Sequence, residues 1–343
     1  GWDGEEDLED CDSASIASSF FENEPLQVEL PGLDEDTYGM GITALVKDSF
    51  MFVHGRGNMA ARVVQLVSSL FLQLLTLVLQ AYLIYELQRL VSSRAVHHGR
   101  SVYTSFETHM YKGHTRELPL GQRRGLDLYF DSGSFDSLDG DLKDEVCAMP
   151  LSQPGFFGAV LFVWALTVAN NMKRIAVLTH RLIWVTPTVS DVHGMLKRIG
   201  KNELLITGLT PVIKFLIVVM VAMPRVLMNA VLLWRGSRWL GSTMDFAELL
   251  LNAMALEFIL LLKDLLYIVI ISDRNKREVQ AMRILPLEPV EHVDSWKYVE
   301  TYSWLCIAVM YTALYLRYQM ILPEYKYDIH GACEAYLANK TKV

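Results

Sequence analysis

Residues 204–272 have the sequence LLITGLTPVIKFLIVVMVAMPRVLMNAVLLWRGSRWLGSTMDFAELLLNAMALEFILLLKDLLYIVIIS. This stretch contains two long apolar arms, Leu204 to Trp234 and Phe246 to Ser272, which are joined by a short loop. Each arm also contains charged residues. A charged side chain at the centre of a bilayer costs about 2.5 to 3.5 kcal/mol, so such residues usually face protein or water and find partners. The stretch therefore predicts a charged membrane hairpin.

Four of these charges are spaced so that each arm has one charged face. Lys214 and Arg225 are eleven residues apart, and Glu257 and Asp264 are seven apart, which is about three and about two helical turns. A hairpin that folds about Leu240 brings opposite charges to similar depths. We therefore predict intramembrane ion pairs between Arg225 and Glu257 and between Lys214 and Asp264. The sequence leaves open whether they only hold the hairpin together, act in permeation or gating, or partly snorkel to an interface.

The rest of the chain has the composition of a membrane protein. It has 343 residues, is 52% hydrophobic and has a positive mean hydropathy. We predict an all-α, multi-pass transmembrane helical bundle of about five spans within residues 63–322, with a small extramembrane loop module. The predicted spans are Val63–Tyr85, Gly155–Met172, Leu204–Trp234, Phe246–Ser272 and Thr301–Leu322.

Basic residues beside these spans predict the orientation of the chain. They gather in the second and fourth loops between spans: Lys173, Arg174, Arg181, Lys197, Arg198 and Lys201, then Arg274, Lys276, Arg277, Arg283 and Lys297. Loops rich in Lys and Arg are usually cytoplasmic. The N-terminus should then be cytoplasmic, with the first loop, residues 88–154, and the C-terminal tail, residues 323–343, on the opposite side.

The cysteines provide a test of that orientation. Cys147 in the first loop and Cys333 in the tail fall on the same, oxidising side, where a disulfide between them is expected; two unpaired thiols are the alternative. Asn339 begins an N-x-T triplet on this side and is a candidate for glycosylation. Cys11 should be reduced and cytoplasmic, and Cys306 should lie within the fifth span.

The N-terminal segment, residues 1–40, is strongly acidic. It contains thirteen of the thirty-nine acidic residues and no Lys or Arg. This composition predicts an arm that is disordered or that depends on a partner for its structure. The interfacial segment, residues 41–62, follows. Residues 41–53 alternate apolar and small residues, which predicts an interfacial helix that leads into the first span, and glycines in residues 54–58 interrupt it.

A polar stripe runs along the first predicted span. Its members recur every three or four residues on an otherwise aliphatic helix: Gln65, Ser69, Gln73, Thr76 and Gln80. Amide and hydroxyl groups in a membrane commonly hydrogen-bond to neighbouring helices. Helix packing is therefore the first interpretation, and a pore-lining stripe has the same pattern.

The first loop ends in an acidic stretch that could attract a cation. Its acids are Asp127, Asp131, Asp136, Asp139, Asp141, Asp144 and Glu145. Their spacing does not match the calcium-binding loop of an EF-hand, which needs ligands at alternate positions and a closing Glu. We interpret the stretch as a solvated acidic surface and predict no metal site.

The sequence contains no pattern typical of an enzyme. A phosphate-binding glycine loop, a nucleophile elbow and a metalloprotease motif are all missing, and the nine histidines are scattered. The basic clusters flank predicted spans, which accounts for them without a nucleic acid partner. We therefore expect no catalytic residue and no cofactor, but bound membrane lipids.

The hairpin also resembles a known family. The residues that carry the resemblance stand in order: Pro224-Arg225, Trp234, Trp239-Leu240, Thr243, Phe246 and the run Asn252-Ala253-Met254-Ala255-Leu256-Glu257-Phe258. They resemble a family of uncharacterised multi-pass membrane proteins of single-celled algae and related protists, over about residues 216–267. Those proteins continue with an Asp-rich string, where this chain has Leu261, Leu262, Lys263 and Asp264. The difference argues against a cation site built on that string, and the resemblance implies no activity.

Two classes of function remain from the sequence. In the first, the protein is a non-catalytic accessory or structural subunit of a larger membrane complex, with other membrane subunits or copies of itself as partners. In the second, it is a homo-oligomeric ion channel or transport subunit that uses the charged hairpin.

Overall fold

The computed structural model describes residues 30–53, 59–118, 123–199, 203–286, 295–318, 321–322 and 324–340. They form two compact units. Unit 1 contains the described residues of Gly1–Gln73, Val177–Ala222 and Leu266–Val293, and unit 2 contains those of Leu74–Ala176, Met223–Leu265 and Asp294–Val343. Most of the predicted acidic arm, residues 1–29, lies outside the part of the chain that the structure describes.

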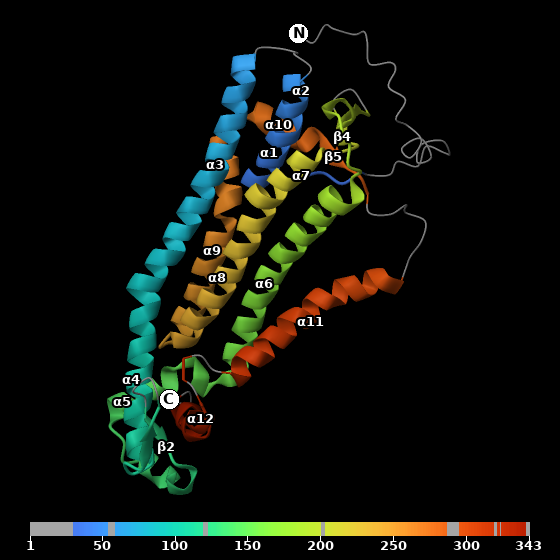
Figure 1. The fold of residues 1–343 in the computed structure, drawn as a ribbon. Helices are drawn as coiled ribbons and strands as arrows, with labels where there is room; N and C mark the ends of the chain where they lie inside the picture. Colours follow the sequence, from blue (N-terminus) through green and yellow to red (C-terminus); the bar gives the residue numbers. More distant parts are fainter. Residues whose placement is uncertain are drawn as a thin grey trace. The chain divides into compact units, whose positions relative to one another are not determined.

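Unit 1 begins with helix α1 (Thr37–Thr43), which continues through the π-helical segment η2 (Ala44–Asp48) into α2 (Ser49–Val53) (Figure 1). Asp36 caps α1, because its carboxylate accepts hydrogen bonds from the backbone N–H groups of Tyr38 and Gly39 at 3.0 and 2.8 Å. Every residue of α1 is buried. The predicted interfacial segment, residues 41–62, shares only residues 41–43 with α1, and it stays a prediction.

The first arm of the hairpin begins as a strand rather than a helix. Strand β4 (Leu204–Ile206) pairs antiparallel with β3 (Leu196–Arg198) and parallel with β5 (Met282–Ile284). Helix α7 (Pro211–Ile217) starts only at its proline. Proline suits the first helical position, because the N–H that it lacks would have no helical partner there. Residues 204–210 are thus outside the membrane helix that the sequence predicted to include them.

Unit 1 is completed by short segments around these elements. Helix α7 continues into the π-helical segment η9 (Val218–Ala222), and α10 (Asp273–Ala281) precedes β5. This unit also includes the first part of α3 (Met59–Glu86). It includes the last residues of the α6 region as well, through the π-helical segment η7 (Arg181–Val185).

Unit 2 contains long helices and a small module. A β-hairpin and the C-terminal helix are parts of this module. The helices of unit 2 are α4 (Ser93–Met110), α5 (Gly140–Ala148), most of α6 (Pro154–His180), α8 (Met223–Ser242), most of α9 (Phe246–Ile270), α11 (Ser295–Arg317) and α12 (Asp328–Lys340). Strands β1 (Thr115–Glu117) and β2 (Arg123–Gly125) form the antiparallel hairpin.

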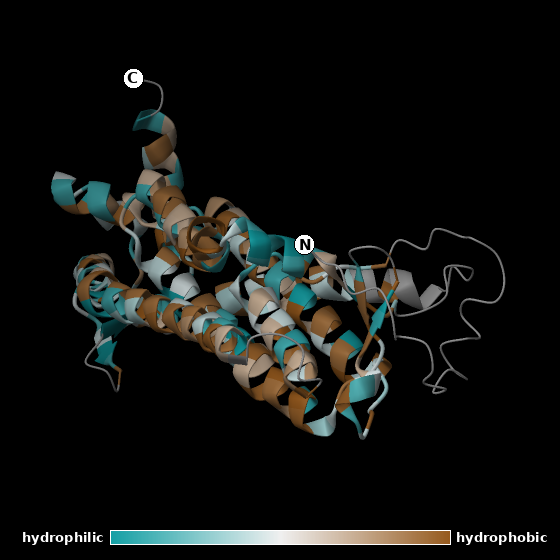
Figure 2. Cartoon of the chain, turned by 90° about the horizontal axis from the view of Figure 1, so that it is seen from above, coloured by the Kyte–Doolittle hydropathy of each residue, from teal (hydrophilic) through white to brown (hydrophobic). Residues whose placement is uncertain are grey.

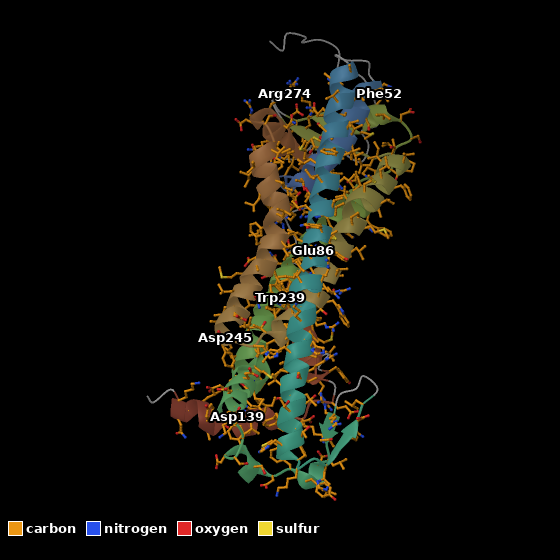
Figure 3. The ribbon with its side chains drawn as sticks, turned by 90° about the vertical axis from the view of Figure 1, so that its left-hand side faces the viewer. Phe52, Glu86, Asp139, Trp239, Asp245 and Arg274 are labelled. Carbon is orange, nitrogen blue, oxygen red and sulfur yellow. A yellow bond between two sulfur atoms is a disulfide. The ribbon has the colours of Figure 1, made fainter. Side chains whose placement is uncertain are left out.

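Helices α6, α8 and α9 approach closely in unit 2 at a glycine. A Cβ atom added to Gly236 of α8 would lie 2.8 Å from Leu256 Cδ1 of α9 and 3.1 Å from Trp164 Cζ2 of α6. Small residues at helix interfaces allow such close approach. The chain turns at residues 243–245; Figure 3 labels Trp239, near the end of α8, and Asp245 in the turn itself.

Three helical stretches among the described residues are long and apolar enough to cross a membrane: Ala60–Met110, Pro154–Val185 and Pro211–Ser242. Figure 2 shows apolar residues along the long helices. Helix α9 is also long, but it carries Glu248, Glu257, Lys263 and Asp264. The structure thus agrees with a multi-pass helical membrane protein, and three of the predicted spans correspond to helices that are long and apolar enough to cross a membrane.

The first predicted loop, residues 88–154, begins as a helix, because the helix that contains the first predicted span continues into it. Helix α3 runs through the π-helical segment η3 (Leu87–Ser92) into α4, so helix extends to Met110. The polar α4 still buries Tyr103, Phe106 and Glu107. The extramembrane module therefore includes a helical stem that hydropathy alone did not show.

Candidate functional site

The polar stripe of α3 faces protein. Ser69, Gln73, Thr76 and Gln80 are at most 6% exposed, whereas apolar side chains on the rest of the helix are more than half exposed, among them Val64, Val67, Phe71, Leu74 and Val78. This is the arrangement expected if the stripe packs against neighbouring helices. A helix at the surface of a soluble protein buries its apolar face and exposes its polar face; α3 does the opposite.

Gln73 compensates for a break in the helix opposite it. Proline lacks a backbone N–H, so Pro224 cannot donate to the carbonyl four residues earlier, which is that of Met220 in η9. The Gln73 side-chain amide donates a hydrogen bond to that carbonyl oxygen within unit 1. In unit 2, Gln80 Nε2 likewise donates to the backbone oxygen of Ile259 at 3.0 Å. The stripe thus bonds to the backbone of other helices.

We expect Gln73→Leu to lower the free energy of unfolding by about 0.6 to 1.7 kcal/mol, the range measured for hydrogen bonds between membrane helices. The substitution leaves the Met220 carbonyl without its amide donor. Denaturant unfolding of the full chain in detergent would measure the effect. Ser68→Ala is the control, since Ser68 is exposed on the same helix. Equal stabilities of the two variants would contradict the packing role.

Lys214 binds the end of another helical segment. Its Nζ donates to the backbone oxygens of Ile183 and Thr186 at 2.9 and 2.6 Å and to Thr188 Oγ1 at 2.9 Å. A lysine has three N–H donors, so these bonds use all of them. Carbonyls at a helix C-terminus have no helical partners and favour a cation. Lys214 therefore supplies hydrogen bonds to backbone carbonyls at the C-terminal end of η7.

The predicted pair between Lys214 and Asp264 is therefore wrong in its partners. Asp264 Oδ1 accepts instead from Nζ of the adjacent Lys263 at 2.8 Å. The prediction assumed that Lys214 lies deep within a helix that starts at Leu204. It actually lies only three residues after Pro211, where α7 begins.

The predicted pair between Arg225 and Glu257 depended on the position of the turn. Arg225 is 3% exposed, whereas Glu257 is exposed on α9. Because α8 ends at residue 242 and α9 starts at 246, the midpoint is 244, four residues beyond the assumed Leu240. Residue 225 lies 19 before this midpoint and 264 lies 20 after it, so the shift favours Asp264 as the partner. The pair with Glu257 remains a prediction.

A charge-reversal experiment distinguishes the two carboxylates. We expect Arg225→Glu to reduce the yield of folded protein, because it places a carboxylate at a buried position of α8. Asp264→Arg should restore part of that yield, whereas Glu257→Arg should not. Monodispersity by size-exclusion chromatography would measure folding, and rescue by Glu257→Arg alone would favour the original pair.

A buried ion pair occupies the extramembrane module of unit 2. Arg124 Nη1 lies 2.9 Å from Glu107 Oε2, and both side chains are at most 2% exposed. The backbone N–H of Gly125 donates to the same carboxylate at 3.4 Å. The guanidinium carbon of Arg124 also lies 4.6 Å from the centre of the Tyr103 ring, in a cation–π contact.

Asp328 extends this network into the C-terminal helix. Its carboxylate accepts hydrogen bonds from the hydroxyls of Tyr103 at 2.8 Å and Tyr111 at 3.2 Å. Burial raises the pKa of Asp328, while these two hydrogen bonds lower it. Burial, followed by the Asp328 carboxylate, raises the pKa of the Tyr111 hydroxyl. Sequence reasoning missed the network, because its members come from separate segments with no repeated spacing.

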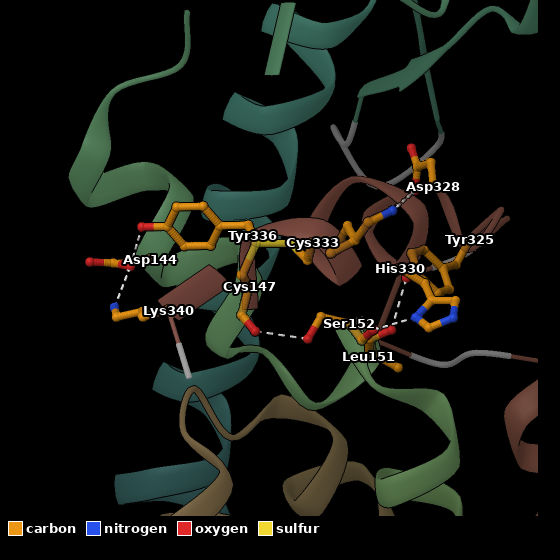
Figure 4. The surroundings of a disulfide bond; sticks show 11 residues. Asp144, Cys147, Leu151, Ser152, Tyr325, Asp328, His330, Cys333, Tyr336 and Lys340 are labelled. Carbon is orange, nitrogen blue, oxygen red and sulfur yellow. Dashed lines mark hydrogen bonds and ion pairs between the residues drawn. A yellow bond between two sulfur atoms is a disulfide. The ribbon is translucent and has the colours of Figure 1, made fainter. Parts of the chain in front are cut away.

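Cys147 of α5 and Cys333 of α12 form a disulfide with their Cα atoms 5.3 Å apart, as the topology predicted (Figure 4). Hydrogen bonds surround it: Ser152 Oγ donates to the Cys147 oxygen, Tyr325 Oη donates to the Leu151 oxygen, and His330 Nδ1 contacts the Ser152 oxygen. The disulfide and these bonds tie α12 to the loop before α6. Cys306 is an exposed free thiol, and Cys11 lies outside the described residues.

Three of the seven acids of the first loop form ion pairs with basic residues of unit 2. Asp127 pairs with Lys326, Asp131 with Lys112 at 2.9 Å, and Asp144 with Lys340 at 2.6 Å. The hydrogen bond from Lys340, and then that from Tyr336, lowers the pKa of Asp144. No group of three or more His, Cys, Asp or Glu in the described parts of the chain could hold a metal. Asn339 is exposed on α12, but Thr341 of its triplet is not described.

A second cluster, in unit 1, joins the polar stripe to α10. Glu278 receives a hydrogen bond from Gln65 Nε2 at 2.9 Å and pairs with Lys47 Nζ at 2.9 Å. Arg274, one turn earlier on α10, lies 3.6 Å from the same carboxylate. This cluster gathers charges from η2, α3 and α10, and nothing in the sequence identified Lys47 or Glu278 as partners of Gln65.

Comparison with known proteins does not extend these observations. No protein-family model matches the chain, and neither curated proteins nor solved structures gave a match. The resemblance of residues 216–267 to an algal membrane-protein family therefore stays a prediction, and the function must be argued from the chain's own geometry.

Proposed function

We propose that this chain is a non-catalytic integral membrane protein that acts as an accessory or structural subunit of a larger membrane complex. The observation that carries the proposal is the position of Glu257. This residue is near the middle of α9, on an outward face that it shares with Met254, Phe258 and Leu261, which are 46 to 67% exposed. A carboxylate on an apolar outward face requires a partner or water when the helix lies in a membrane.

The other polar residues of the long helices support the same proposal. Gln73 and Gln80 bond to backbone carbonyls, and Lys263 bonds to Asp264. These groups hold the chain together and leave Glu257 as an outward-facing charge. Moreover, no more than 39% of the most apolar window of each candidate span is buried within the chain. Large apolar faces are thus available to lipids and to neighbouring transmembrane helices.

The proposal includes a five-span topology in which α9 and α11 are the fourth and fifth spans. The N-terminus is then cytoplasmic, and the module with its disulfide lies on the opposite side. The Cys147–Cys333 bond supports this orientation, because disulfides persist in oxidising compartments and are rare in the cytosol. The basic residues of α10 also support this orientation, because loops rich in Lys and Arg are usually cytoplasmic.

The native mass and polypeptide content of the particle extracted in mild detergent test the proposal. We expect other polypeptides in fixed ratio with the 39.0 kDa chain, and we expect Glu257→Leu to reduce their recovery. Leu251→Ala is the control, because Leu251 is 64% exposed on the same helix and carries no charge. A monomeric particle, or recovery that is equally insensitive to both substitutions, would contradict the proposal.

A homo-oligomeric ion channel or transport subunit is the second candidate. The same exposed Glu257 favours it, since several copies could direct this carboxylate toward a shared aqueous path. A particle that contains only this chain would support the channel. In that case Glu257→Gln should change ion selectivity in flux recordings, while Leu251→Ala should leave it unchanged.

A further inference from the structure

Asp48 is a buried acid that the proposed function does not use. It is the last residue of η2 and is 4% exposed. Its Oδ2 atom is buried and has no hydrogen-bond partner among the described residues. A buried carboxylate oxygen without a partner is costly when the group is ionised, because water no longer solvates its charge. The group is therefore placed to hold a proton instead.

The charges around Asp48 come from three elements. Its neighbour Lys47 pairs with Glu278 of α10 at 2.9 Å, and Arg62 of α3 also contributes. Of the other described elements that pack most closely on η2, α1 contains no Asp, Glu, Lys, Arg or His and has Tyr38 as its titratable residue, and α2 contains no titratable residue. The third, α7, contains Lys214, whose ammonium is bonded to three oxygens at the end of η7.

These surroundings shift the pKa of Asp48 in opposite directions. Burial is the largest effect and raises the pKa of Asp48 from 3.8 to about 6. Lys47 and Arg62 lower the pKa, and the Glu278 carboxylate raises it. Burial prevails, because the lysine charge is largely committed to Glu278.

We propose that Asp48 is a proton-binding site of unit 1, which takes a proton from water in mildly acidic conditions and returns it to water near neutral pH. Protonation removes a buried negative charge beside Glu278 and leaves the ion pair between Glu278 and Lys47 intact. The O–H that forms can donate a hydrogen bond, which an ionised carboxylate cannot. Unit 1 is thus more stable with the proton bound.

The sign of the pH dependence follows from linkage. Since the pKa of Asp48 is about 6 in the folded chain and 3.8 in the unfolded chain, the folded state binds the proton more tightly between these values. Stability is highest below the lower pKa, falls as pH rises through the higher one, and then levels off. A shift of this size corresponds to about a hundredfold increase in the unfolding constant across the window.

Unfolding of the full chain in nanodiscs between pH 4 and pH 8 tests the proposal. Asp48→Asn keeps the shape of the side chain without its charge, so we expect this variant to lose most of the hundredfold change, which falls between about pH 4 and pH 6. Asp273→Asn is the matched control in unit 1, because that side chain is 92% exposed. If Asp48→Asn retains the full pH dependence, the proposal is wrong.

Infrared spectroscopy provides a readout that does not depend on unfolding. The protonated-carboxyl band of the folded protein at pH 5 should contain a component from Asp48, which Asp48→Asn lacks and Asp273→Asn keeps; the buried Asp328 and Glu107 contribute to the band in all three proteins. Glu278→Gln should move the midpoint of the Asp48 component toward acid, and Lys47→Gln should move it toward base, because these neighbours act in opposite directions. Absence of this component, or shifts of the same sign, would overturn the assignment.

Discussion

Replacement of Cys147 and Cys333 by serine should lower the free energy of unfolding of the extramembrane module by about 5 kcal/mol. The two cysteines are 186 residues apart, and the entropy lost by the unfolded chain when a disulfide closes a loop grows with the logarithm of its length. For a loop of this length the model gives about 5 kcal/mol at 25 °C. Both sulfurs lie in the hydrophobic core of unit 2, so the double variant keeps similar packing.

The experiment compares thermal unfolding and limited proteolysis of the double-serine chain with those of the parent. Faster cleavage between α11 and α12 is expected, because the bond ties α12 to α5. Cys306→Ser is the control, since Cys306 is an exposed free thiol, and it should leave both measurements unchanged. A double variant as stable as Cys306→Ser would show that the hydrogen bonds around the disulfide suffice to hold α12.

The second large effect concerns the buried ion pair of the same module. Glu107→Ala should destabilise the folded chain by about 3 to 5 kcal/mol, because Arg124 would keep a buried positive charge without its carboxylate. Arg124 is only 1% exposed, so water cannot readily solvate it without local unfolding. The contact of Arg124 with the Tyr103 ring offsets only a small part of this cost.

Denaturant unfolding of Glu107→Ala, of Arg124→Met and of the double variant would measure the coupling energy between Glu107 and Arg124. We expect the double variant to be more stable than Glu107→Ala, because removing both charges also removes the cost of burying one alone. Glu324→Gln is the control for an exposed ion pair, since Glu324 pairs with Arg116 at the surface, and it should have little effect. Additive losses in the double variant would contradict direct coupling between Glu107 and Arg124.

Several elements of the fold were predictable from local pattern. The apolar runs around residues 63–85, 155–172 and 211–234 became long helices, because length and hydropathy depend only on neighbouring residues. The three-to-four-residue spacing of Gln73 and Gln80 placed them on one face of α3, which the structure turns toward protein. The predicted disulfide between Cys147 and Cys333 is present in the structure.

The ion pairs of the hairpin were less predictable, because their depths depend on where each helix starts and ends. Thr210 and Pro211 start α7 later than the apolar pattern suggests, which places Lys214 near a helix end. The turn at residues 243–245 lies beyond Leu240. Each residue of displacement at the turn changes the matched position on the second arm by two, so a small error in the turn moves the position opposite Arg225 away from Glu257.

The sequence by itself determined that the chain is a helical membrane protein, which faces of its helices are polar, and which cysteines can meet. Only the tertiary structure decided that Asp48 is buried beside Glu278, that Arg124 lies on Glu107, and that Asp328 receives two tyrosine hydroxyls. The physical reason is that hydropathy and helical spacing are local properties of the chain. Burial and charge pairing arise between segments far apart in sequence, whose contacts are fixed only when the helices and the module pack.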